Sequence, residues 1–407
     1  MMLSEPYIRI AVISDLHCQK GDDSVKVTKL HTKLLDNPPN VNPVESFKKI
    51  IIDNNKKVDY FFVLGDIADK GNIDGFNLGV KLVKEINTLL NADKLIFAVG
   101  NHDMDIQKAN HQQNPEYMMK QTNDFPFLFR DKSQLEGKEK KFWADKYCVI
   151  EDDKTLILVL NTSCFMKDKD NLKPLVFDNA MEDSLKNELL QYQCPKKLKI
   201  AICHHHPVQH CDFDDKYTSL DCIDRGSKLV ELLKSNNFTL LMYGHKHLPQ
   251  LIYERNLPVF CSGSFSSLEN TSSIEVGNTI HFLDIFQEGN IFKGTIETWT
   301  HSTMEGWKKL SNLELRNRFP SYTGFGSKME ISKIVENIWE IFYKQYEGSD
   351  SYEQYITRDK KKISERINDI NFLIPIELNK LYDELEKKNI TIRADKNAEI
   401  TLCLKKE

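Results

Sequence analysis

The chain has 407 residues, of which 40% are hydrophobic and 28% are charged. This composition is typical of a globular protein that can bury a sizeable core, and the length favours one large domain with an appendage. The net charge of −5 excludes a global attraction to nucleic acid or to anionic membranes, so any basic groove must be local.

The apolar residues of the chain are arranged in short runs, which indicate buried strands and not membrane spans. Residues 1–6 lack a signal-peptide pattern, and no run approaches the ~18 apolar residues of a membrane span, so we expect a cytoplasmic protein without membrane contact. Short apolar runs rich in β-branched and aromatic residues then recur, and each stops at a polar cluster, which predicts strands. These runs are residues 8–13, 58–64, 95–99, 155–160, 198–202, 238–243, 258–261, 280–286 and 291–298.

Helical spacing of apolar residues separates several of these runs. The predicted helices are residues 44–54, 76–90, 182–192 and 223–233. Strands that alternate with helices favour an α/β fold, in which ligands bind beyond the carboxyl ends of parallel strands. Five of the runs end in chemically active side chains, and the other strands are expected to complete a second sheet layered on the first.

Two segments depart from this alternation. Residues 110–145 are too long for a simple connection, and both a substrate lid and an ordinary helical insertion remain open, with the insertion favoured. The end of the chain repeats apolar residues at helical spacing, with Pro375 separating two helices, and residues 390–404 alternate like a hairpin. We therefore expect a domain at residues 1–302 and a mainly helical region at residues 303–407.

The polar residues that follow five of the predicted strands carry the chemistry. They are Asp15, His17, Asp66, Asn101, His102, Asp103, His204, His205, His206, His245 and His247. Carboxylates and imidazoles suit manganese, iron or zinc, and a cluster of them would repel or remain unsatisfied without cations. Asp15 and His17 would share a face because residues two apart in an extended chain do, and the same argument applies to His245 and His247.

These residues form the motifs DxH, GD, GNHD, HxP and GHxH, in that order within residues 7–300. The set resembles the calcineurin-like metallophosphoesterase superfamily. The resemblance implies a four-layered α-β-β-α sandwich with a dinuclear metal centre, in which manganese is expected first and iron or zinc are alternatives. It implies that the first ion is held by Asp15, His17, Asp66 and His247, and the second by Asp66, Asn101, His205 and His245.

The run of three histidines leaves the register of one ligand open. In the family the liganding histidine stands two residues before the proline, which selects His205 here. His204 and His206 are then expected to pack or to form hydrogen bonds outside the ligand set, although a shift by one residue would exchange these roles.

The resemblance also implies a mechanism. Two ions would clamp a phosphate and activate a water for in-line attack on phosphorus. His102 lies next to Asn101, so we expect its imidazole to protonate the leaving group as the general acid, with Asp103 placed to orient it. No nucleophilic Ser or Cys motif is apparent, so no covalent intermediate is expected.

The form of one motif favours two branches of the family. The GNHD form at residues 100–103 resembles the phosphodiesterase and nuclease branches, because the phosphoprotein phosphatases have GNHE with a preceding arginine. We therefore expect hydrolysis of a cyclic nucleotide or a related nucleotide. The alternative is a metal-dependent DNA or RNA nuclease that needs a basic track beside the metals. Candidates for this track are Lys108, Lys120, Arg130, Lys132 and the lysines of residues 138–146.

The C-terminal region suggests a role in assembly. In the nuclease alternative, residues 303–407 would dock the enzyme as the effector subunit of a larger complex, or would join a second copy of the chain. The aromatic residues available for such an interface are Trp339, Phe342, Tyr343 and Tyr346. The competing interpretation is that this region packs on its own domain.

Overall fold

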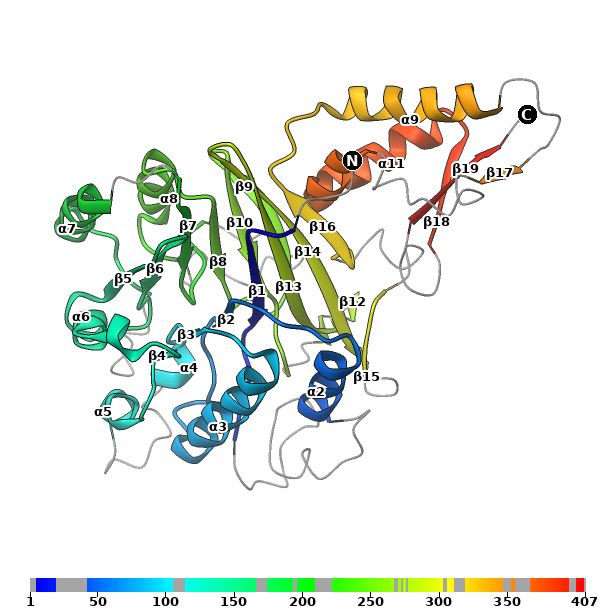
Figure 1. Ribbon diagram of the computed structural model, residues 1–407. Coiled ribbons are helices and arrows are strands. Elements are labelled where there is room, and N and C mark those ends of the chain that lie inside the picture. The colour runs from blue at the N-terminus through cyan, green and yellow to red at the C-terminus, as the bar shows by residue number, and fades with distance from the viewer. Residues whose placement is uncertain are drawn as a thin grey trace. The chain divides into compact units, whose positions relative to one another are not determined.

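The computed structural model forms two compact units (Figure 1). The larger unit comprises Arg9–His281 and Thr300–Trp307, and the smaller comprises Met1–Ile8, Phe282–Trp299 and Lys308–Glu407. The structure describes residues 5–19, 42–104, 114–165, 174–192, 196–208, 222–266, 270–271, 274–275, 277–302, 306–310, 319–346, 353–355, 367–394 and 400–405.

The first sheet of the larger unit contains the N-terminal strands. Its parallel strands are β1 (Ile8–Ile13), β2 (Tyr60–Val63) and β3 (Lys94–Phe97), and β4 (Phe127–Phe129) joins β3 antiparallel. The strands β2 and β3 are buried at every residue, as expected for parallel strands that are covered on both faces.

Two helices in contact with each other, α2 (Pro43–Asp53) and α3 (Ile73–Leu90), lie in the connections between these strands. The helix α2 begins where the Asn42 side chain accepts the backbone N–H groups of Val44 and Glu45, with Pro43 in the first turn.

The second sheet has six strands in the order β5-β6-β7-β8-β10-β9. These strands are β5 (Tyr147–Glu151), β6 (Thr155–Leu160), β7 (Leu198–Ile202), β8 (Leu240–Tyr243), β9 (Gln250–Glu254) and β10 (Leu257–Cys261). The four inner strands are parallel, and β5 and β9 are antiparallel edges. Helices α7 (Asn179–Leu189) and α8 (Gly226–Ser235) lie beside this sheet (Figure 1). Their leucines pack into its hydrophobic core. The two-sheet α/β architecture expected from the sequence is therefore confirmed.

A buried polar network joins the two sheets. Lys94 on β3 forms an ion pair with Asp152, which also accepts a hydrogen bond from the Tyr60 hydroxyl. Tyr60 Oη lies 2.6 Å from Thr155 Oγ1 on β6. The Lys94 side chain is 9% exposed and that of Asp152 is 19% exposed. Removing either Lys94 or Asp152 alone should therefore destabilise the fold, because it leaves a buried charge without a partner.

We expect Asp152→Ala to lower the free energy of unfolding by about 2–3 kcal/mol, because it leaves the Lys94 ammonium buried and unpaired. The partial exposure of Asp152 keeps the loss below that of a fully buried pair. Urea unfolding measures the change, with the exposed neighbour change Asp153→Ala as control. The double change Lys94→Met with Asp152→Leu should recover most of the loss, and an equal loss in it would contradict the ion-pair explanation.

A buried histidine makes the larger unit sensitive to acid. His281 lies on β13 (Asn278–Glu288), 1% exposed, with its Nε2 atom 2.6 Å from the Ser262 carbonyl oxygen. Burial lowers the pKa of His281 from 6.5 to about 4, against the opposing effect of the hydrogen bond to Ser262. Between about pH 6.5 and pH 4, His281 is therefore protonated in the unfolded state and stays neutral in the folded state.

The stability that depends on neutral His281 should be complete above about pH 6.5 and should be lost as the pH falls toward 4, a contribution of about 3 kcal/mol. His281→Gln removes the titration and retains a donor for the Ser262 carbonyl. The difference in unfolding free energy between this variant and the parent should shift by that amount between pH 7 and pH 4. Parallel stability curves for the two proteins would contradict the assignment.

The described part of the predicted insertion belongs to the core. It contains α5 (Pro115–Gln121), β4 and α6 (Lys138–Asp145). Four of its aromatic side chains are at most 2% exposed: Phe125, Phe127, Phe129 and Phe142. Because β4 extends the first sheet and these rings are buried, the described residues 114–145 pack into the larger unit, and the choice between an insertion and a lid stays a prediction. Residues 110–113 of the predicted segment lie outside the described residues.

The smaller unit combines helices with short strands. Helices α9 (Ile331–Tyr346) and α11 (Pro375–Glu386) share a hydrophobic core, and Pro375 stands in the first turn of α11. Strands β14 (Ile291–Ser302) and β16 (Tyr322–Phe325) pair antiparallel.

The C-terminal strands of this unit form a sheet of their own, in the order β17-β19-β18. The strands β18 (Ile390–Ala394) and β19 (Ile400–Lys405) pair antiparallel like the predicted hairpin. The strand β17 (Glu353–Tyr355) adds a third that the sequence patterns did not indicate. Among the described residues, no helix combines the length and the apolar character that crossing a membrane requires.

Candidate metal centre

The predicted metal ligands follow the carboxyl ends of five parallel strands. Asp15 and His17 follow β1, Asp66 follows β2 and Asn101 follows β3, while the histidine pairs 204–205 and 245–247 follow β7 and β8. Side chains from both sheets of the larger unit meet here, and ligand atoms of several of them lie within 4.8 Å of one another.

The backbone at these positions takes a conformation that L-residues seldom adopt. Five non-glycine residues of the centre have a positive φ between 47° and 70°: Asp15, His17, Asp66, His245 and His247. The left-handed region is uncommon outside glycine and concentrates at functional sites. The backbone at Asp15 and His17 is therefore not extended, as the argument from an extended chain required. Left-handed backbone conformations at both residues orient their side chains instead.

The glycines of two motifs make room for the carboxylates. A Cβ atom at Gly100 would lie 2.1 Å from Asp66 Oδ1, and one at Gly244 would lie 2.7 Å from Asp15 Oδ2. Neither position can accept a larger residue without displacing a carboxylate. Glycine therefore stands in the GNHD and GHxH motifs because a side chain there would collide with a carboxylate of the centre. The sequence alone did not reveal this steric requirement.

The first group of candidate ligands is Asp15, His17, Asp66 and His247, whose ligand atoms lie within 4.8 Å of one another. The Nε2 atoms of His17 and His247 are 3.0 Å apart, and Asp15 Oδ1 lies 3.2 Å from His247 Nε2. Asp66 Oδ2 is 3.8 Å from His17 Nε2. Two carboxylates and two imidazoles whose ligand atoms lie this close together fit a divalent cation.

The second group is centred on Asn101. Its Oδ1 atom lies 2.9 Å from His204 Nε2 and 3.0 Å from His245 Nδ1, and Asp66 Oδ2 is 3.4 Å from His204 Nε2. His204 Nδ1 lies 2.7 Å from the Leu64 carbonyl oxygen, which accepts its N–H. His204 Nε2 therefore faces two oxygen atoms, Asn101 Oδ1 and Asp66 Oδ2. A lone pair on Nε2 would repel both oxygen atoms, so a proton or a cation must lie between them.

Asp66 is common to both groups and is 1% exposed. Burial alone would raise the pKa of Asp66, but His204, His102 and His17 hold it well below its usual range. Burial lowers the pKa of His204, whereas Asp66 and Asp15 more than offset this and raise it to about 9. A cation bound beside Asp66 would compete with the proton of His204 for the same carboxylate.

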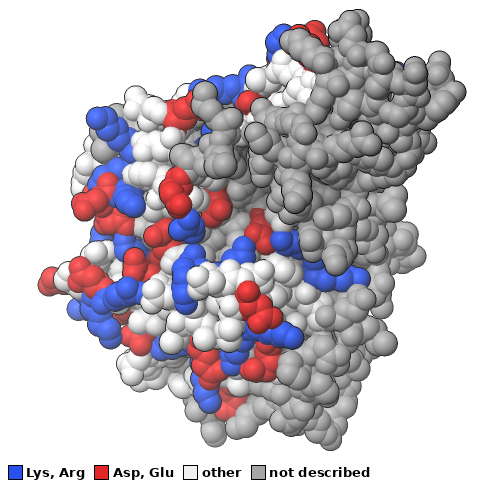
Figure 2. Space-filling model, turned by 45° about the vertical axis from the view of Figure 1, so that its right-hand side comes forward, with Lys and Arg blue, Asp and Glu red and all other residues white. Residues whose placement is uncertain are grey.

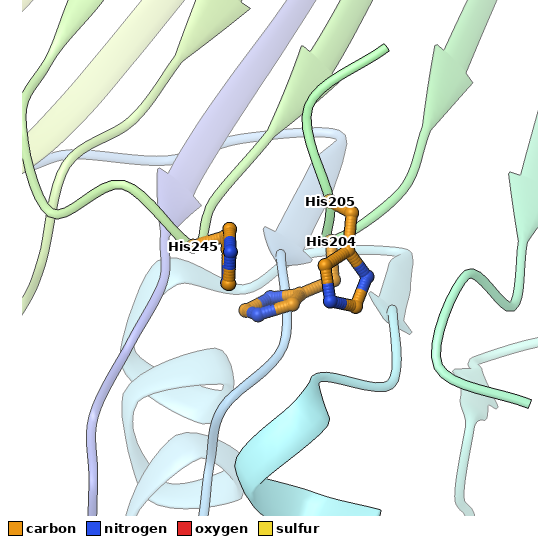
Figure 3. A group of neighbouring side chains, drawn as sticks. All are labelled: His204, His205 and His245. Carbon is orange, nitrogen blue, oxygen red and sulfur yellow. The ribbon is translucent and has the colours of Figure 1, made fainter. Parts of the chain in front are cut away.

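The structure places His204, rather than His205, where the sequence motif predicts a ligand beside Asp66 and Asn101. His205 Nδ1 lies 2.9 Å from Thr162 Oγ1, and its buried Nε2 atom has no hydrogen-bond partner among the described residues. Figure 3 shows the rings of His204, His205 and His245 gathered at the ends of their strands. Ligand atoms of His204 and His205 both lie within 4.8 Å of one of His245, so the choice between His204 and His205 as the ligand stays a prediction.

The predicted general acid, His102, and the residue predicted to orient it, Asp103, have different surroundings. The His102 side chain is 26% exposed, and its Nδ1 atom lies 3.4 Å from Asp69 Oδ1. Asp103 is buried, and its carboxylate accepts the backbone N–H groups of Gly100 (2.9 Å) and Ala68 (2.8 Å). Asp103 therefore braces two loops of the centre, and the carboxylate that lies against His102 is Asp69.

Asp69 was not among the predicted site residues, although the sequence carried a signal for it. Asp69 stands three residues after Asp66 in Gly65-Asp-Ile-Ala-Asp69, and it approaches two imidazoles of the centre. Its Oδ1 atom lies 3.6 Å from His17 Nδ1 as well as 3.4 Å from His102 Nδ1. A carboxylate behind a ligating histidine fixes the tautomer and the ring orientation.

Comparison with solved structures gives likenesses in fold. A dimetal phosphatase from Danio rerio is 11% identical, with a TM-score of 0.47 over 73% of this chain and 100% of that chain. The purple acid phosphatase PPD1 from yellow lupin is 13% identical, with a TM-score of 0.47 over 74% of this chain and 52% of that one. The phosphopantetheinyl hydrolase of Mycobacterium tuberculosis is 14% identical, with a TM-score of 0.35 over 63% of this chain and 89% of that one.

A search of the curated proteins found no match. The model of the calcineurin-like phosphoesterase family matches residues 8–249, which contain every motif named above and more than half of the 407 residues. The chain therefore belongs to the calcineurin-like phosphoesterase family.

Proposed function

We propose that this protein hydrolyses phosphodiester bonds of a nucleotide with a pair of divalent metal ions. The observation that carries the proposal is the convergence of carboxylates and imidazoles from five strand ends around the shared carboxylate of Asp66. The ligand set proposed for the first ion is Asp15, His17, Asp66 and His247. The set proposed for the second is Asp66, Asn101, His205 and His245, and His204, which lies beside Asp66 and Asn101, is the alternative to His205.

The remaining residues of the centre have roles that follow from their contacts. When bound, two divalent ions supply charge stabilisation for a phosphoryl group and lower the pKa of a water. His102 is exposed enough to reach a leaving group and would donate its proton there. Asp69 Oδ1 lies 3.4 Å from His102 Nδ1, so we expect Nε2 to be the acid atom. The backbone N–H of His102 donates to Asp66 Oδ1 at 2.7 Å and so ties the acid to the metal centre.

The nuclease alternative is weakened by the pairing of the basic side chains. Lys120 pairs with Glu116, Arg130 with Asp93, and Lys132 with Asp124. Figure 2 shows basic and acidic side chains interspersed over the described part of one face. A track for a phosphate backbone needs uncompensated positive charge, so these residues favour a small nucleotide substrate. Lys108, the remaining individually named candidate, lies outside the described residues.

Docking through the C-terminal region stays a prediction. Trp339 packs against the core between α9 and α11, so this ring serves the unit's own packing. The manganese preference is likewise a prediction, because the mixed oxygen and nitrogen ligands also suit iron and zinc.

A substrate panel tests the proposal. The metal-free protein is supplied with Mn²⁺ and assayed on bis-p-nitrophenyl phosphate, on the monoester p-nitrophenyl phosphate, on cyclic nucleotides and on single- and double-stranded DNA. We expect hydrolysis of the diester and of a cyclic nucleotide, with little monoester turnover, and loss of all activity with a chelator. Activity that persists with the chelator would contradict the metal mechanism, and cleavage confined to DNA would support the nuclease instead.

A further inference from the structure

A serine-rich segment, residues 262–266, lies against the loop of the metal centre that carries Asp15 and His17. This serine segment follows β10 directly, and both stretches belong to the larger unit. Three consecutive residues of the serine segment donate hydrogen bonds to three consecutive carbonyl groups of the loop. The donors and acceptors are the Phe265 N–H and Ser14 (2.8 Å), Ser264 Oγ and Asp15 (2.9 Å), and Ser266 Oγ and Leu16. The carbonyl side of the loop is therefore held by a segment that is distant in sequence.

The amide side of the same loop is held by a different partner. The N–H groups of Asp15, His17 and Cys18 donate to the carbonyl oxygen atoms of residues 65–67, at 3.0, 3.0 and 2.7 Å. Asp15 and His17 have φ values of 53° and 47°, a backbone conformation that persists only where the surrounding contacts maintain it. The serine segment on one side and residues 65–67 on the other supply such contacts.

The serine segment is itself fixed by hydrogen bonds. The Ser262 carbonyl oxygen accepts the Thr279 hydroxyl at 2.6 Å, and the Thr279 N–H donates to the Ser264 carbonyl oxygen at 2.7 Å. The Ser262 N–H donates to the Tyr243 carbonyl oxygen at 3.0 Å, directly before the loop that carries His245. The three serines of the segment are at most 3% exposed. A buried and fixed donor determines the position of its acceptor, because water cannot readily take its place.

We propose that Ser264 and Ser266 are positioning residues, whose hydroxyl groups set the direction of the Asp15 and His17 side chains through the loop backbone. This inference rests on the proposed function and concerns residues outside the metal ligands. Without the Ser264 hydroxyl, the Asp15 carbonyl group stays buried and loses this donor, which favours a shift of the loop toward other donors. A misplacement of about 1 Å in an active site can cost about 10²-fold in rate.

Hydrogen exchange tests this positioning without metal or substrate. In the metal-free full chain, the amides of Asp15, His17 and Cys18 should exchange about 10-fold faster in Ser264→Ala than in the parent, because fewer hydrogen bonds keep the loop closed. Mass spectrometry of a peptide that contains these residues measures the rate. With added Mn²⁺, kcat on bis-p-nitrophenyl phosphate should also fall about 10-fold or more, whereas KM should change less.

The matched control is Ser262→Ala, which keeps the backbone contacts of the segment. Ser262 is buried like Ser264, but its hydroxyl donates to the Gly263 carbonyl oxygen within the segment, at 3.2 Å. Its exchange rates and kcat should stay close to those of the parent. Equal exchange in Ser264→Ala and Ser262→Ala, or an unchanged kcat in Ser264→Ala, would overturn the inference.

A second variant, Ser266→Ala, gives the same comparison if Ser264→Ala does not fold. A parent that hydrolyses no diester would instead refute the proposed function. The exchange comparison would then still decide whether the two serines hold the loop, so the two failures are distinguishable.

Discussion

Asp66→Asn should lose both metal ions and at least about 10³-fold of the turnover on a diester. Asp66 is the carboxylate shared by the two groups, with Oδ2 3.8 Å from His17 Nε2 and 3.4 Å from His204 Nε2. The amide keeps the volume of a side chain that is 1% exposed, so the change removes charge without opening a cavity. Metal ions supply several kcal/mol of transition-state stabilisation, and each 1.36 kcal/mol is a factor of ten.

Elemental analysis of the purified variant measures the first effect, and turnover of bis-p-nitrophenyl phosphate measures the second. The exposed change Asp183→Asn serves as the control for removing one carboxylate from the same protein. Thermal unfolding of both variants separates loss of metal from loss of fold. Retention of two ions per chain by Asp66→Asn would show that Asp66 does not bridge them.

The strands that deliver these ligands were predictable because they are buried on both faces. A buried parallel strand is a continuous apolar run, and the run that ends at His204 matches β7 residue for residue. The antiparallel edge strand β9 (Gln250–Glu254) was not predicted, since one polar residue at each end and partial burial give it no distinct pattern. In the C-terminal region, β17 has three residues and pairs with β19, and so short a strand gives no distinct local signal.

The membership of the site was predictable, but its detailed geometry was not. Polar residues at strand ends identify the loops, whereas the direction of each side chain depends on φ values that only tertiary contacts determine. His204 illustrates this, because the hydrogen bond to the Leu64 carbonyl of another loop decides which histidine faces Asp66. Asp103 illustrates the same limit, since its two oxygen atoms accept backbone N–H groups of Ala68 and Gly100 that lie far apart in sequence.

Asp69 and Asp103 have different contacts, and this difference determines which of them can be changed to test His102 as the general acid. Burial and the charge of Asp66 raise the pKa of Asp103 to about 7, against the effect of its two backbone hydrogen bonds. A change at Asp103 would disturb the loops around Gly100 and the metal ligands with them. Asp69 touches His102 and His17 at Nδ1, so Asp69→Asn retains the shape of the contact while removing its charge.

His102→Ala should keep both ions and lose about 10²–10⁴-fold in turnover on diesters whose leaving group is a poor one, such as a ribose alkoxide. The backbone N–H of His102 still donates to Asp66 in the variant, so the metal ligands remain in place. A p-nitrophenolate leaving group needs no proton, and its turnover should fall far less, which makes it the internal control. Asp69→Asn should lower kcat less than His102→Ala and should alter the pH profile of kcat with KM nearly unchanged, because it acts through the ring that it positions. Equal losses on both leaving groups in His102→Ala would assign His102 to metal or substrate binding, since a general acid is needed only where the departing oxygen is strongly basic.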